Sequence, residues 1–212
     1  HLLRDALQKL TLNDSALMYE PDQSQALGSG FRCGFLGLLH MDIVQERLER
    51  EYDLDLVVTA PSVSYELIFK SKEKQMISSP AEMPDASHLT AVAEPWVKME
   101  IVCPKDSVGE IMKLCQQRRG IYKNLSYIDT ERVLLDFEMP LATIILDFYD
   151  ALKNITSGYG SMNYEIIGYR EENLVKLDIM IAGDVVDSLS VICHRSEAEP
   201  LVYERILDPA PE

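Results

Sequence analysis

The sequence predicts an α+β fold in which two ferredoxin-like (split βαβ) sandwiches stand in tandem and a β-hairpin follows them. Two observations carry this prediction. Apolar residues switch repeatedly between a period of two and a helical period along the 212 residues, which is typical of short strands alternating with helices. The segments follow the order α-β-β-α-β in the first third of the chain and β-α-β-β-α-β after a weakly patterned stretch.

The first unit, residues 1–68, lacks the first strand of the split βαβ order. Its expected elements are a helix over 2–12, a strand over 16–20, a turn at 21–22, a strand punctuated by Gly30 and Gly34, a helix over 36–52 and a strand over 54–59. The helix over 36–52 is amphipathic, and the face expected to lie on the sheet carries Ile43, Val44, Leu48 and Tyr52.

The second unit, residues 94–173, follows an expected linker over 69–93, where turn and loop residues predominate. Its expected elements are strands over 97–103, 133–139 and 162–166 and helices over 108–115 and 141–152. Gly158 and Gly160 flank Tyr159 at the last corner, where a left-handed backbone is expected. Residues 174–195 predict a hairpin turning at Ala182-Gly183-Asp184, and the tail over 196–212 is acidic and proline-rich.

Charge and composition exclude several classes of protein. A formal net charge of −15 disfavours non-specific coating of nucleic acid, which depends on many cationic contacts to phosphates. No apolar run is long enough to cross a bilayer. The four cysteines are scattered without metal-ligand spacing, so buried or half-buried reduced thiols are expected and no metal site is predicted. The local basic spots are Lys70-Lys72-Lys74, Arg118-Arg119 with Lys123, and His194-Arg195.

No catalytic or cofactor-binding residue is predicted. The chain has no G-x-x-x-x-G-K-[ST] loop to hold a triphosphate. A nucleophilic pair of Cys33 and His40 lacks a third, orienting group in the sequence, and His40 fits a structural role better. The carboxylates of Glu171-Glu172 are interpreted as solvated charges in a turn.

Long segments resemble one family. From Gly28 to Ile43 the chain reads GSGFRCGFLGLLHMDI, and this run resembles domain III of LepA, a translational GTPase that acts on the ribosome. The second unit resembles domain V of elongation factor G and its LepA counterpart through Glu94-Pro95, Arg118-Arg119-Gly120, Met139-Pro140-Leu141-Ala142 and the run from Thr156 to Met162. Residues 174–195 resemble the start of the C-terminal domain found only in LepA, whereas 196–212 do not match, so the tail is either truncated or divergent.

The resemblance implies the ribosome-docking, non-catalytic part of a LepA-type elongation factor, acting in protein synthesis by back-translocation or rescue of stalled ribosomes. GTP and Mg²⁺ would belong to a GTPase domain absent from this chain. Implied partners are the ribosome, through rRNA and ribosomal proteins, and the parent's own GTPase domain, but neither DNA nor a transmembrane segment. A cytoplasmic location is implied, and the resemblance also allows a peripheral position on the cytoplasmic face of the membrane. The candidate contact residues are Arg118, Arg119, Lys123, His194 and Arg195.

A second hypothesis comes from another class of protein. Tandem ferredoxin-like modules can also sense small molecules or oligomerise, with sheets that pair edge to edge and hold a ligand between them. A P-loop encoded upstream would favour the translation factor, and its absence would favour the sensing module.

Overall fold

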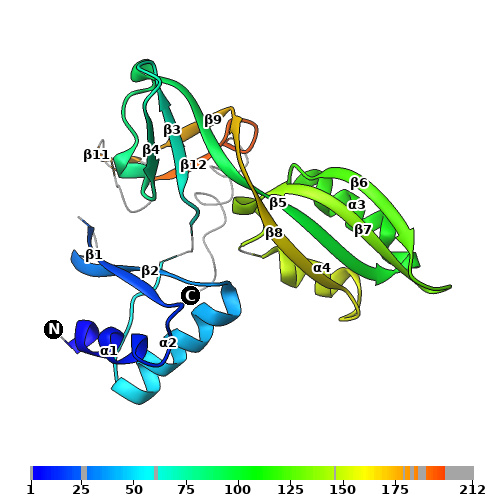
Figure 1. Ribbon diagram of the computed structural model, residues 1–212, viewed down its shortest axis with the longest axis horizontal. Coiled ribbons are helices and arrows are strands. Elements are labelled where there is room, and N and C mark those ends of the chain that lie inside the picture. The colour runs from blue at the N-terminus through cyan, green and yellow to red at the C-terminus, as the bar shows by residue number, and fades with distance from the viewer. Residues whose placement is uncertain are drawn as a thin grey trace. The chain divides into compact units, whose positions relative to one another are not determined.

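The computed structural model describes residues 2–24, 28–59, 62–145, 147–178, 180–181, 184–185 and 190–198. The chain forms two compact units (Figure 1). The small unit comprises His1–Ala60 with Ile179–Leu189, and the large unit comprises Pro61–Asp178 with Ser190–Glu212. No helix in the described part of the chain is long and apolar enough to span a membrane.

The small unit places two helices against a two-stranded antiparallel sheet. Its elements are α1 (Leu2–Thr11), β1 (Met18–Ser24), β2 (Gly28–Gly34) and α2 (Leu38–Tyr52). β1 and β2 pair from Met18 opposite Gly34 to Ser24 opposite Gly28. The buried core consists of Ala6, Leu7, Leu10, Leu17, Val44 and Leu48. The predicted helices and the glycine-rich strand are therefore confirmed, with ends shifted by a few residues.

The turn predicted at Pro21-Asp22 is wrong, because β1 runs straight through it. Pro21 lies opposite Phe31 in the ladder, and Asp22 lies opposite Gly30. Proline is tolerated there because β1 has only one strand neighbour, so the missing amide can face away from the ladder.

The strand predicted over 54–59 is also wrong. These residues pair with no strand in the described part of the chain. In the split βαβ order their neighbour would be a strand that precedes α1, and the described residues of the small unit contain no such strand. Leu54 and Leu56 still pack on the core, while Val57 is 79% exposed. Ile43 of α2 likewise lies outside the buried face predicted for it, because it is 48% exposed while Val44 and Leu48 are buried.

The large unit contains a six-stranded antiparallel sheet. Its strands are β3 (Tyr65–Phe69), β4 (Lys74–Ile77), β5 (Leu89–Pro104), β6 (Ile121–Tyr127), β7 (Arg132–Pro140) and β8 (Ser161–Glu172). β5 pairs with β8 along one edge, and along the other edge with β3 and then β7. The order β8-β5-β7-β6 is that of a ferredoxin-like sandwich, so the predicted fold class is confirmed.

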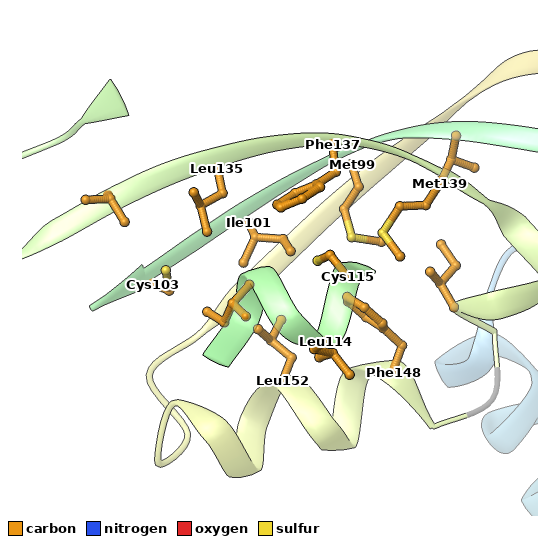
Figure 2. Close-up of a cluster of buried hydrophobic side chains, with 14 residues drawn as sticks. Met99, Ile101, Cys103, Leu114, Cys115, Leu135, Phe137, Met139, Phe148 and Leu152 are labelled. Carbon is orange, nitrogen blue, oxygen red and sulfur yellow. The ribbon is translucent and has the colours of Figure 1, made fainter. Parts of the chain in front are cut away.

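Two helices, α3 (Val108–Gln117) and α4 (Phe148–Ile155), cover one face of this sandwich (Figure 1). Alternate residues of β5 and β7 point toward them, as the period of two predicts. Figure 2 shows Met99, Ile101 and Phe137 facing Leu114 and Phe148 across the core. All five side chains are at most 8% exposed. This packing fixes the helix ends and strand ends that carry the charged residues.

Regular structure in the large unit extends beyond the predicted elements. Residues 69–93, expected to form a linker, contain β4, the 3-10 turns η1 (Pro80–Glu82) and η2 (Ala86–His88) and the start of β5. Ile77 and Val92 are buried in this region, so it has a core that its turn-rich composition conceals. The helix predicted over 141–152 begins only at Phe148, because Pro140 leads into the 3-10 turn η4 (Leu141–Thr143).

The predicted hairpin over 174–195 appears as paired strands. β9 (Leu174–Leu177) pairs with β12 (Val191–His194), and β10 (Met180–Ile181) pairs with β11 (Asp184–Val185). Residues 182 and 183 of the predicted turn lie outside the described residues, as does the tail from 199 onward.

Candidate functional site

The charged residues of the large unit are the candidate site, and most of the predicted contact residues lie beside carboxylates. An Arg118 guanidinium nitrogen (Nη2) lies 2.7 Å from an Asp147 carboxylate oxygen (Oδ2). Lys123 Nζ lies 3.1 Å from Glu138 Oε1. Arg118 is the first residue past α3, and Lys123 lies in β6.

Arg119 is placed by the way α3 ends. Its amide donates to the Gln116 carbonyl at 3.2 Å, and the Gly120 amide donates to the Cys115 carbonyl at 2.7 Å, which together form a Schellman motif. Arg119 adopts the left-handed conformation with φ of 61° at the position where glycine is usual. A Cβ on Gly120 would lie 2.7 Å from the Cys115 oxygen, so glycine is required there.

From this left-handed position the Arg119 side chain reaches the buried carboxylate of Glu94. Arg119 Nη2 donates to Glu94 Oε1 at 2.6 Å, and the same nitrogen lies 3.5 Å from Glu172 Oε2. The side chain of Glu94 is 2% exposed and that of Arg119 is 15% exposed. Burial raises the pKa of Glu94 above its ordinary value, although Arg119 opposes that shift. The geometry therefore gives Arg119 a structural role in holding a buried charge.

A second ion cluster lies on β6, β7 and β8. Arg170 Nη2 lies 2.7 Å from Glu138 Oε2, and the Arg170 guanidinium sits 4.5 Å from the ring centroid of Trp96. Arg170, and to a smaller extent Lys123, lower the pKa of Glu138. One carboxylate therefore pairs with two cations, and a tryptophan that is 3% exposed packs under one of them.

The last two predicted residues lie at the end of β12. His194 Nε2 is 4.0 Å from Glu172 Oε2, and its Nδ1 lies 2.7 Å from Ser196 Oγ. Arg195 is exposed, and its backbone amide donates to the Asn173 carbonyl at 2.9 Å. The structure thus links His194 to the Glu94–Arg119–Glu172 cluster through Glu172 and leaves the Arg195 side chain at the surface.

Sequence reasoning misses the carboxylates that surround these cations. The interpretation of Glu172 as a solvated charge in a turn is wrong, because this residue ends β8 and is half-buried against Arg119. Glu94 and Glu138 give a weaker signal, because apolar residues stand directly beside each of them in β5 and β7. The assignment of the five basic residues as ribosome contacts stays a prediction, and Arg118 and Arg195 offer the more accessible guanidinium groups.

In the small unit, His40 is held by two hydrogen bonds. Its Nδ1 accepts from the Leu36 amide at 3.0 Å, and its Nε2 lies 2.7 Å from Asp14 Oδ2. The third group that the sequence did not reveal is therefore Asp14, whose pKa is lowered chiefly by its hydrogen bond to His40. Burial raises the pKa of the Cys33 thiol. With both imidazole nitrogens occupied, His40 cannot activate that thiol and is structural, as predicted.

Comparison with known proteins finds similarity to proteins named as elongation factors. A family model described as Elongation factor G C-terminus matches residues 91–180. A curated relative from Desulforudis audaxviator (strain MP104C), named Elongation factor 4, is 52% identical over 99% of this chain and 35% of its own length. Relatives of the same name from Lactobacillus delbrueckii subsp. bulgaricus and Acetivibrio thermocellus are 56% and 57% identical over 92% of this chain and 32% of their own lengths.

A crystal structure of a protein from Thermus thermophilus matches with a TM-score of 0.56 at 16% identity, over 97% of this chain and 40% of that one. At this identity the likeness concerns the fold alone. The chain spans about a third of the length of the curated relatives it matches.

Proposed function

This chain is homologous over nearly its whole length to elongation factor 4, the LepA family of translation elongation factors, and on that premise we propose that it is the ribosome-docking, non-catalytic part of such a factor. The observation that carries the proposal is the sequence identity of 52% to 57% with relatives named Elongation factor 4, which extends across both units of the chain. The same homology favours this function over a small-molecule sensing or oligomerisation module.

The proposed division of labour rests on the resemblance to a translational GTPase and on the chain's similarity to about a third of the length of its relatives. The charged clusters of the described residues pair cations with carboxylates inside the large unit. GTP and Mg²⁺ are assigned to a GTPase domain that this chain does not contain. The chain would act in the cytoplasm by docking on the ribosome and relaying that state to the GTPase domain, in support of back-translocation or rescue of stalled ribosomes.

Ribosome binding by the chain tests the proposal. The chain should co-sediment with bacterial 70S ribosomes, and calorimetry should detect no saturable binding of GTP. A double variant, Arg118→Gln with Arg195→Gln, should weaken ribosome binding and reduce its salt dependence. The slope of the logarithm of the binding constant against the logarithm of salt concentration should fall by roughly one unit for each contact to phosphate that is lost. Lys113→Gln, which removes one positive charge at an exposed position of α3, is the matched control for Arg118→Gln and for Arg195→Gln taken singly. Failure of the unmodified chain to co-sediment would overturn the docking role.

A further inference from the structure

The loop that joins α4 to β8 (Figure 1) carries an exposed aromatic residue, Tyr159. Tyr159 is 80% exposed, more than any other tyrosine, phenylalanine or tryptophan in the described part of the chain. Ser157 and Gly158 just before it are both left-handed, with φ of 50° and 86°. For Ser157, which has a side chain, this conformation is costly unless surrounding contacts hold it, whereas glycine adopts it freely.

Those contacts are present. The Gly160 amide donates to Thr156 Oγ1 at 2.7 Å, and the Lys153 ammonium donates to the Gly160 carbonyl at 2.7 Å. Thr156 is 2% exposed, and its hydroxyl donates to the Leu152 carbonyl at 2.8 Å. A buried hydroxyl and a lysine therefore fix the backbone on both sides of Tyr159. The loop is built rigidly around a side chain that the fold itself does not bury.

A groove lies beside the Tyr159 ring. Val102 and Pro104, at the end of β5, contribute apolar lining, and Asp106 and Arg132 contribute charged groups. Arg132 is held by Asp129 at 2.8 Å. Asp106 is exposed, lies in the turn η3 (Lys105–Ser107) and offers a carboxylate that accepts hydrogen bonds. A groove lined by an aromatic residue, by apolar residues and by a hydrogen-bond acceptor suits a flat heterocycle that carries N–H donors.

We propose that this groove stacks one unpaired guanine base of RNA on Tyr159, an inference that rests on the proposed docking function. Single-stranded RNA is recognised by stacking of splayed bases on aromatic side chains and by hydrogen bonds to base edges. Guanine offers adjacent N1–H and N2–H donors that match the two oxygens of a carboxylate such as Asp106. Asp106, which lines the groove, repels phosphate, so the base and not the backbone enters, while the charge of Glu131 is compensated by Lys105 at 3.0 Å.

Nucleotide titration of the chain, followed by NMR of its backbone amides, tests the proposal. Guanosine 5′-monophosphate should shift the amide signals of Gly158 and Gly160 with a Kd on the order of 10 mM, the range expected for a single stacked base. Ribose 5-phosphate, which lacks the base, should leave them unchanged, and uridine 5′-monophosphate should bind more weakly. Tyr159→Ala should abolish the shifts and Tyr159→Phe should keep them. Tyr127→Ala is the matched control, because Tyr127 is 74% exposed and does not line the groove.

Ribosome binding separates this inference from the docking function. Tyr159→Ala should weaken binding to 70S ribosomes by about 5- to 150-fold, the loss of one base stack, while Tyr127→Ala binds as the unmodified chain does. If the chain binds ribosomes and Tyr159→Ala changes neither that binding nor the nucleotide shifts, the inference is overturned and the docking function stands. Equal shifts from ribose 5-phosphate, or none from any nucleotide, also overturn it. If the chain shows the nucleotide shifts but does not bind ribosomes, the docking function fails alone.

Discussion

Replacing Arg119 by glycine separates the backbone role of this residue from its side-chain role. Arg119 holds a left-handed conformation with φ of 61°, which glycine adopts without strain. The loss of this backbone strain should stabilise the folded state by about 1 kcal/mol. The side chain loses its 2.6 Å hydrogen bond to Glu94, which leaves a carboxylate of 2% exposure without its main counter-ion. Breaking a buried ion pair costs about 3 to 5 kcal/mol. The net expectation is destabilisation of the large unit by about 2 to 4 kcal/mol.

The pH dependence of this loss identifies its cause. Burial already raises the pKa of Glu94, and removal of Arg119 raises it further. Between the ordinary glutamate pKa, about 4.3, and the raised value, the folded variant binds a proton that the unfolded chain does not. The free energy of unfolding of the Arg119→Gly variant therefore rises as pH falls through that window. The destabilisation at pH 7 should shrink by pH 5.

Urea unfolding followed by tryptophan fluorescence is the appropriate assay. The chain has a single tryptophan, Trp96, which lies in β5 and is 3% exposed, so its emission reports the large unit. Arg118→Gln is the control, because it breaks a more exposed pair with Asp147 and should cost no more than about 1 kcal/mol. An Arg119→Gly variant as stable as the unmodified chain at pH 7, or equally destabilised at pH 5 and pH 7, would refute the reasoning.

Three smaller changes test local geometry, the first two by the same urea assay. Gly158→Ala should cost about 1 kcal/mol through backbone strain alone, since φ is 86° and an added Cβ meets nothing within 4 Å; unchanged stability would contradict that backbone. Lys72→Gly should stabilise the large unit by about 1 kcal/mol, because Lys72 is left-handed at φ of 68°; a loss would mean that the lysine side chain contributes there. Burial raises the pKa of the Cys115 thiol to about 12, so iodoacetamide at pH 8 should alkylate half-buried Cys33 well before Cys115, as mass spectrometry of the peptides would show. Alkylation of Cys115 as fast in the native chain as in urea would contradict its burial.

The alternation of apolar residues was sufficient to predict the sandwich of the large unit. In β5, Val97, Met99, Ile101 and Cys103 follow a period of two, and they all face the helices because a strand turns successive side chains to opposite sides. Gly158 was predictable for a similarly local reason, since a glycine just past a helix end commonly takes the left-handed conformation. Both inferences depend only on near neighbours in the sequence.

Strand pairing was harder to predict, because it depends on which partner is available. The sequence pattern of residues 54–59 suits a strand, yet they join no sheet in the described part of the chain, whereas the turn-rich stretch over 69–93 acquires β4 and a buried Ile77 by pairing with β3. Hydrogen-bonding groups of the backbone are satisfied across strands, so local composition does not decide whether a ladder forms.

The sequence alone determined the family resemblance, the ferredoxin-like order of the large unit and the positions of the basic residues. Only the tertiary structure decided what those basic residues do, because ion pairing is set by distance in space and not along the chain. Arg119 lies 25 positions from Glu94 along the chain, yet their side chains meet at 2.6 Å. Exposure is equally a property of the folded molecule: Tyr159 resembles any other tyrosine in the sequence, and the fold leaves it 80% exposed beside a groove.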